Sequence, residues 1–285
     1  MSPGSAAVDA AAQVGRGVHA ERVRTTGLRS FLILCALPAG VVLPLIITFG
    51  IAAVAERISR LNSSAISVSA ATSSNSVYWI ITFTAVVGAL AAAYAQATSM
   101  RGPARDVDRY LYPRSWTSAA ARWIYYGLLT AVVSAVLVAV VMSALPVAFP
   151  TVYGDVALTS PAGIRFLITV PIYAFFACGL GVGLAGLIGH PAGTLAILLF
   201  WVFVMEDAII FVPNGSKIQS FMPFLNGVWG TGQDLVITPP WGVTGALVWF
   251  GAICAAVFVL GAAAVALRRR PGRPARSPRL PQNSR

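Results

Sequence analysis

MRGPARDVDRYLYPRSWTSAAAR, residues 100–122, is a charged interval between two long apolar runs. It contains five arginines and two aspartates, whereas only 10% of the 285 residues are charged and 57% are hydrophobic. A soluble domain of this length carries roughly 25% charged residues, and the mean hydropathy here is +0.78. The interval therefore indicates a polar connection between two membrane-spanning helices.

Working outward from this connection, six apolar runs are long enough to cross a membrane. At about 1.5 Å per residue, roughly 20 helical residues cross a hydrocarbon core of about 30 Å. The sequence predicts an all-α polytopic membrane protein with spans at residues 31–55, 78–100, 123–144, 164–188, 193–212 and 241–267. Pro38 and Pro44 predict a kink in the first span.

The basic residues predict the orientation. Sixteen of the twenty lie in residues 1–30, in the interval 100–122 and in the tail from residue 268. The positive-inside rule therefore predicts a plasma-membrane protein with both termini in the cytoplasm, embedded in the lipid bilayer. The net charge of +11 is explained by this topology, and nucleic acid is not expected as a partner. Residues 1–15 are expected to lack regular structure, and residues 268–285 to form a disordered basic tail.

Several shorter features predict local structure. Residues 213–240 are broken too often by glycine and proline to form a span, so short helices at the outer interface are expected. His190 is read as a turn or capping residue before the fifth span. The three cysteines show no metal-ligand or disulfide spacing and are read as small buried side chains. Gly179 and Gly183 form a small-xxx-small face that allows close helix packing.

Glu206 and Asp207 are acidic residues inside the predicted fifth span. Charged groups at such a depth are costly unless paired or hydrated, and they are candidates for a functional role. Two interpretations remain open: a structural ion pair, for instance with Arg165, or a place in the lining of a polar substrate pathway.

The sequence contains no GxxxxGK[ST] phosphate loop, and no GxSxG or HExxH motif. We therefore expect no catalytic residue, no metal and no cofactor in this chain, and no enzymatic activity of its own.

The pattern resembles the permease subunits of type-2 ABC transporters, mostly exporters. The features that carry the resemblance are a charged N-terminal segment with Glu21, Arg24 and Arg29–Ser30, six spans, a cytoplasmic connection between spans two and three, and residues 213–240 outside. The segment LYPRSWTSAAARWIYYGL, residues 111–128, is similar to the family's segment in which a small helix, a proline and a basic residue precede the next membrane span. Where many members carry an E-R-E-x-G-T-like phrase, this chain has Arg101-Gly-Pro-Ala-Arg-Asp.

The resemblance implies a second permease chain and a separate ABC ATPase subunit that binds ATP-Mg. It also implies that the charged connection docks on that ATPase. The implied coupling residues are Arg105, Asp106, Asp108, Arg109, Tyr110, Tyr112 and Arg114.

Other readings remain open beside the resemblance. The charges of the connection are also consistent with simple membrane anchoring. The chain is also consistent with a membrane subunit that transports nothing, or with an ion-coupled secondary transporter that uses Glu206 or Asp207.

Overall fold

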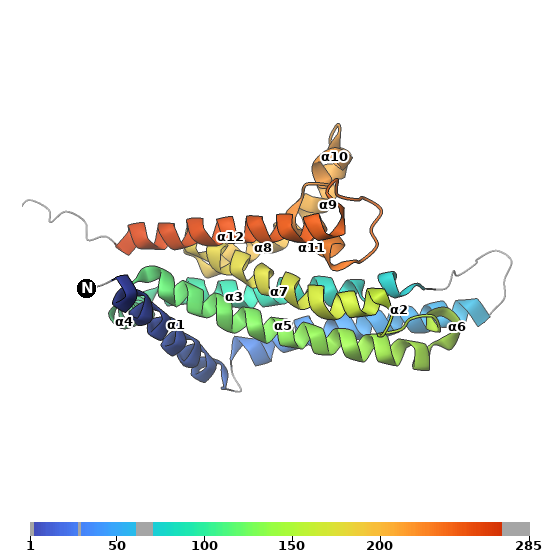
Figure 1. Ribbon diagram of the computed structural model, residues 1–285, viewed down its shortest axis with the longest axis horizontal. Helices are drawn as coiled ribbons and strands as arrows, with labels where there is room; N and C mark the ends of the chain where they lie inside the picture. The colour runs from blue at the N-terminus through green and yellow to red at the C-terminus, as the bar shows by residue number, and fades with distance from the viewer. Residues whose placement is uncertain (1–2, 28–29, 61–70, 270–285) are drawn as a thin grey trace, which may run out of the picture.

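The computed structural model describes residues 3–27, 30–60 and 71–269, and every regular element within these residues is a helix (Figure 1). Within the described residues, six helices are long and apolar enough to cross a membrane, which confirms the predicted all-α fold with six candidate spans. They are Leu32–Arg60, Tyr78–Ser99, Ser115–Ala148, Pro161–Ile188, Pro191–Phe211 and Gly242–Arg269. Arg29 and the part of the predicted tail at residues 270–285 lie outside the described residues.

The first span is irregular near its start. Two π-helical turns, Leu32–Ala36 and Pro38–Val42, precede α2 (Leu43–Arg60). Proline has no backbone N–H and clashes with the preceding turn of a helix, which favours a departure from regular α geometry near Pro38. A kink was predicted from Pro38 and Pro44. The π-helical turn Pro38–Val42 departs from regular α geometry, whereas Pro44 lies in the first turn of the regular helix α2.

The charged connection is shorter than predicted. It forms α4 (Gly102–Leu111), and α5 (Ser115–Ala148) begins well before the expected residue 123. The segment between Pro113 and Trp123 has no glycine or proline and contains three alanines, the best helix formers. Arg122 is therefore inside a long helix and not in a loop.

The N-terminal segment corrects a second expectation. Residues 3–25 form one helix, α1 (Pro3–Thr25), where the first 15 residues were expected to be irregular. The segment is rich in alanine, and Pro3 occupies the first helical turn, where a missing N–H is tolerated. Contact with α5 adds to this local propensity, because Gly17 lies directly against Ala121.

α3 (Tyr78–Ser99) and α7 (Pro161–Ile188) occupy the centre of the bundle. In the most apolar window of α3, 78% of residues are buried inside the protein, against 17% in the first span. A Cβ on Gly183 would lie 2.5 Å from the carbonyl oxygen of Val257 in α12 (Gly242–Arg269), and one on Gly179 would meet the ring of Trp123. Both glycines therefore permit close packing, as the spacing predicted.

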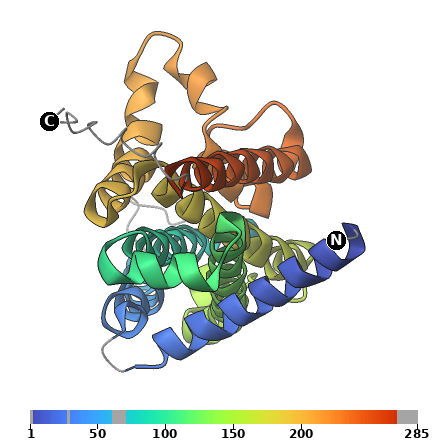
Figure 2. The same cartoon turned by 90° about the vertical axis from the view of Figure 1, so that its left-hand side faces the viewer.

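The two ends of the bundle differ. α1, α4 and the last turn of α12 share one end, which we call the basic end (Figure 1). Seen from this end, α1 lies obliquely across the bundle (Figure 2). Toward the other end, α10 (Gly215–Gln219) and α11 (Pro223–Thr231) are the short helices expected between the fifth and sixth spans.

The fifth span is built from several pieces. α8 (Pro191–Phe200) continues through a π-helical turn, Trp201–Met205, into α9 (Glu206–Ala208) and a final turn, Ile209–Phe211. His190 caps α8, since its Nδ1 accepts the Gly193 N–H at 3.2 Å, and the predicted capping role is confirmed. The described cysteines are all free, and Cys35 is exposed and not buried as expected.

Candidate functional site

A buried arginine joins four helices at the basic end. Arg122 lies on α5, and its side chain is 3% exposed. Its guanidinium donates to Glu21 of α1 at 2.9 Å, to Asp108 of α4 at 2.8 Å and to the amide oxygen of Gln96 in α3 at 2.9 Å. A buried charge is tolerated when it is paired and its donors are satisfied. Arg122 meets both conditions.

Asp108 extends these contacts to α12. One of its carboxylate oxygens accepts from Arg122, and the other accepts from Arg269 and from Ser118. Arg269 also donates to the carbonyl oxygen of Tyr112 at 2.9 Å. We use the name arginine network for the connected side chains Glu21, Gln96, Asp108, Arg122 and Arg269.

Two of the seven implied coupling residues are not accessible to a partner. Asp108 and Tyr112 are both buried, because α4 turns this face toward α1, α5 and α12. Burial also raises the pKa of the Tyr112 hydroxyl above its ordinary value of 10.0, although the nearby Arg122 lowers it. The expectation that Asp108 and Tyr112 contact an ATPase is corrected accordingly.

The other coupling residues lie in different places. Asp106 and Tyr110 are exposed on the outer face of α4, next to the exposed apolar side chains of Val107 and Leu111. Tyr110 is 87% exposed, against 55% for Val107 and 51% for Leu111. α4 therefore presents an outer face of mixed aromatic, apolar and acidic character.

Arg105 and Arg109 do not belong to this outer face. They lie one helical turn apart and line a cavity that α4 shares with α12. Arg114 is half-buried at the start of α5 and interacts with other residues of the chain.

Toward the opposite end, Glu206 is a buried cap for α11. Its carboxylate accepts the backbone N–H of Phe224 at 2.9 Å and of Leu225 at 2.8 Å, and the indole N–H of Trp201 at 3.1 Å. The first N–H groups of a helix have no partner within it and attract negative charge. Glu206 therefore connects α11 to the fifth span through hydrogen bonds.

The expected ion pair with Arg165 is not formed. Arg165 donates from Nη2 to the carbonyl oxygen of Gly230 at 3.1 Å, near the C-terminal end of α11. Glu206 thus has a structural role as the acceptor for the N-terminus of a helix, and not as the partner of an arginine. Residues 213–240 fold back onto the fifth span, which brings this helix N-terminus to Glu206.

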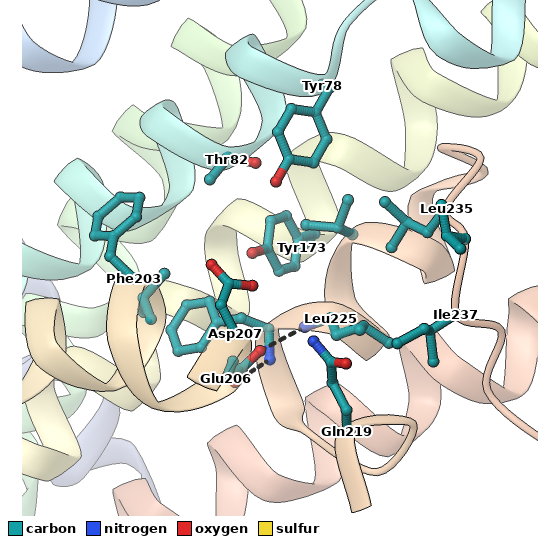
Figure 3. Close-up of a pocket in the computed structure, with 14 residues that line it drawn as sticks. Tyr78, Thr82, Tyr173, Phe203, Glu206, Asp207, Gln219, Leu225, Leu235 and Ile237 are labelled. Atoms are coloured by element: carbon teal, nitrogen blue, oxygen red, sulfur yellow. Dashed lines mark hydrogen bonds between the residues drawn. The ribbon is translucent and has the colours of Figure 1, made fainter. Parts of the chain in front are cut away.

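Asp207 lies in the lining of a cavity of about 220 Å³. Figure 3 shows its carboxylate directed toward the hydroxyl groups of Tyr78 and Tyr173. Tyr173 is fully buried, and its hydroxyl has no hydrogen-bond partner. The side-chain oxygen of Gln219, which lines the same cavity, is buried and also has no hydrogen-bond partner. Unpartnered buried polar atoms are uncommon in folded proteins. The cavity therefore combines several polar groups with a largely apolar lining.

In the described part of the chain, no three His, Cys, Asp or Glu side chains are grouped as metal ligands. No protein-family model matches this sequence, and no curated protein or solved structure matches it either.

The arginine network was not predicted as a unit. From the sequence, Arg122 was predicted only as one of the charges of the connection, and no contact was predicted for Gln96 or Arg269. A usable signal was present, since Gln96 and Arg122 are polar residues close to the ends of apolar spans. Such residues face the protein interior and pair with one another.

Proposed function

We propose that this chain is the membrane-spanning permease subunit of a type-2 ABC exporter. In this proposal two permease chains enclose the substrate pathway, and separate ATPase subunits bind ATP-Mg and hydrolyse it. The order of elements supports the proposal. A helix precedes the first span and another separates spans two and three at the basic end, while α10 and α11 separate spans five and six.

The observation that carries the proposal is the two-sided character of α4. Its inner face is held by Asp108 to Arg122 and Arg269, whereas its outer face exposes Tyr110 and Asp106. A short helix that is rigidly attached on one side and free on the other is suited to receive force from a docked subunit. Conformational coupling of this kind needs a contiguous set of contacts.

The arginine network supplies such contacts. In the proposed mechanism, closure of the ATPase subunits displaces α4, and Arg122 transmits the displacement to α5 and α1. Arg269 transmits it to α12 in the same way. The spans then tilt as rigid bodies, and the cavity lined by Asp207 opens for release of the substrate. The positive-inside rule supports a cytoplasmic location for the basic end, where ATP is available.

The proposal is tested by affinity purification of the tagged chain from its native membrane, together with any ATPase subunit that binds it. The wild-type chain is expected to co-purify with the ATPase and to stimulate ATP hydrolysis in lipid nanodiscs. Tyr110→Ala combined with Asp106→Arg should weaken association with the ATPase by about tenfold, which corresponds to about 1.4 kcal/mol, and should lower the stimulation as well.

Phe211→Ala is a matched control, because Phe211 is an aromatic residue that is 88% exposed toward the other end of the bundle. This variant should leave both association and stimulation unchanged. Substrate transport by the purified chain alone, driven by an ion gradient, would overturn the proposal.

A further inference from the structure

A second cavity lies at the basic end of the bundle. Its volume is about 390 Å³, and it is bounded by the ends of α3, α7 and α12 and by one side of α4. Four of the residues that line it are arginines, namely Arg105, Arg109, Arg268 and Arg269.

The charge of this cavity is not balanced within the described residues. Its only acidic lining residue is Asp108, and that carboxylate is already engaged by Arg122 and Arg269. Arg268 donates to the carbonyl oxygens of Gly186 and Leu187 at the end of α7, at 3.0 and 2.5 Å. Carbonyl groups satisfy its donors but do not cancel its charge, so the cavity remains strongly positive.

Arg109 is incompletely bonded in this cavity. Its Nε is buried and has no hydrogen-bond partner. Its Nη2 reaches the carbonyl oxygen of Arg268 at 3.5 Å, which is longer than a normal N–H···O bond. Arg105 lies one turn earlier on the same face of α4, and no carboxylate among the described residues pairs with either arginine. Two guanidinium groups are therefore available to one anion.

Phosphate is the anion that best suits paired guanidinium groups, since each planar fork binds two of its oxygens. The rest of the lining favours a phosphate that is attached to a lipid. Met100, Ile188 and Val265 add apolar surface, and they lie at the ends of three predicted spans. Basic pockets at this level between spans hold lipid head groups.

We propose that this cavity binds the phosphate group of an anionic phospholipid from the surrounding leaflet. The lipid phosphate lies between Arg105 and Arg109 of α4, and its glycerol and upper acyl chains follow Val265 and Ile188. Binding joins α4 to the ends of α7 and α12 through the lipid. The proposal does not depend on an ATPase partner and is tested on the chain alone.

The experiment measures lipid binding to the purified full chain in neutral detergent by native mass spectrometry. Phosphatidylglycerol, zwitterionic phosphatidylcholine and inorganic phosphate are the three probes. Phosphatidylglycerol should bind at least about tenfold more tightly than phosphatidylcholine. Arg109→Gln should lower the affinity for phosphatidylglycerol by about tenfold. Arg105→Gln changes an exposed residue at the cavity rim, so it reports on the site even if Arg109→Gln fails to fold.

Arg16→Gln is the matched control, since Arg16 is an exposed arginine of α1 and its loss removes the same charge. Its phosphatidylglycerol affinity should equal that of the wild type. An equal loss in Arg16→Gln and Arg109→Gln would show general surface attraction and overturn the proposal. Displacement of the lipid by inorganic phosphate at comparable concentration would assign the site to a soluble phosphate and would also overturn it.

Discussion

Arg122 is the residue on which the basic end depends most. It is the only member of the arginine network that contacts α1, α3 and α4 at once, through Glu21, Gln96 and Asp108. Removal of one member of a buried ion pair is far more costly than the pair's net contribution, because the remaining charge stays buried without compensation. Arg122 has two such partners.

Arg122→Gln should therefore lower the free energy of unfolding by roughly 3–5 kcal/mol. Arg24→Gln is the matched control, since Arg24 also pairs with Glu21 but its side chain is 54% exposed. An exposed pair contributes roughly 0–1 kcal/mol. Denaturant unfolding in detergent, followed by tryptophan fluorescence, compares the two variants. Equal losses would contradict the proposed importance of burial.

Glu206 and Asp207 are neighbours with different roles, and substitution separates them. Glu206→Gln replaces the carboxyl group that accepts the Phe224 and Leu225 N–H groups. An intramolecular hydrogen bond contributes about 0.5–1.5 kcal/mol, and the substitution alters two of them, so exchange of these two amides with deuterium should accelerate by about tenfold.

Asp207→Asn should leave amide exchange in α11 unchanged. The N–H groups at the start of α11 donate to the carboxyl group of Glu206 and not to that of Asp207. The substitution should lower substrate transport in reconstituted vesicles, since Asp207 lines the cavity. Faster exchange in α11 in the Asp207→Asn variant would show that both acids are structural.

At the scale of the elements, the contact between α7 and α12 depends on the absence of side chains. A Cβ on Gly183 would lie 2.5 Å from the carbonyl oxygen of Val257, and one on Gly261 would lie 2.1 Å from the carbonyl oxygen of Gly183. Backbone atoms cannot move aside as a flexible side chain can. The two helices would have to separate to accept even one methyl group.

Gly183→Ala should therefore destabilise the bundle by about 1–3 kcal/mol, the usual cost of overpacking. Gly50→Ala is the control, because a Cβ there would meet no atom within 4 Å. It should be neutral or slightly stabilising, since alanine favours helix over glycine. Thermal unfolding in detergent measures both variants, and a neutral Gly183→Ala would show that the interface is loose.

At the scale of the whole molecule, the even number of span-length helices brings α1 and the end of α12 to the same side. That side carries Arg122, Arg268 and Arg269 together with the arginines of α4. The proposed function requires this side to face the cytoplasm. α10 and α11 then lie toward the outer surface.

Single cysteines test this orientation in intact cells, after the native cysteines are replaced by alanine. Tyr110→Cys and Val236→Cys place thiols at sites that are 87% and 102% exposed and lie toward opposite ends of the bundle. A membrane-impermeant maleimide should label Val236→Cys at once and Tyr110→Cys only after permeabilisation. The reverse pattern would put α4 outside and exclude docking on an ATPase.

Membrane spans are predictable from the chain because apolar length is a local property. Runs of about 20 apolar residues must lie in hydrocarbon as helices, and the helices Tyr78–Ser99 and Pro161–Ile188 lie close to the predicted positions. Local rules also suffice for the His190 cap and for the short helices after Phe211. The N-terminal helix was missed because its apolar stripe is weak, and its contact with α5 is not visible in the sequence.

The pairing of charged residues is a different matter, because it joins positions that are far apart in the chain. Glu21, Asp108 and Arg269 meet at Arg122 only after α1, α4 and α12 have packed around α5. The sequence places the charged interval 100–122 between two spans. Only tertiary packing decides that Asp108 turns inward to a buried arginine while Tyr110 turns outward, since a buried charge must find its partner within the fold.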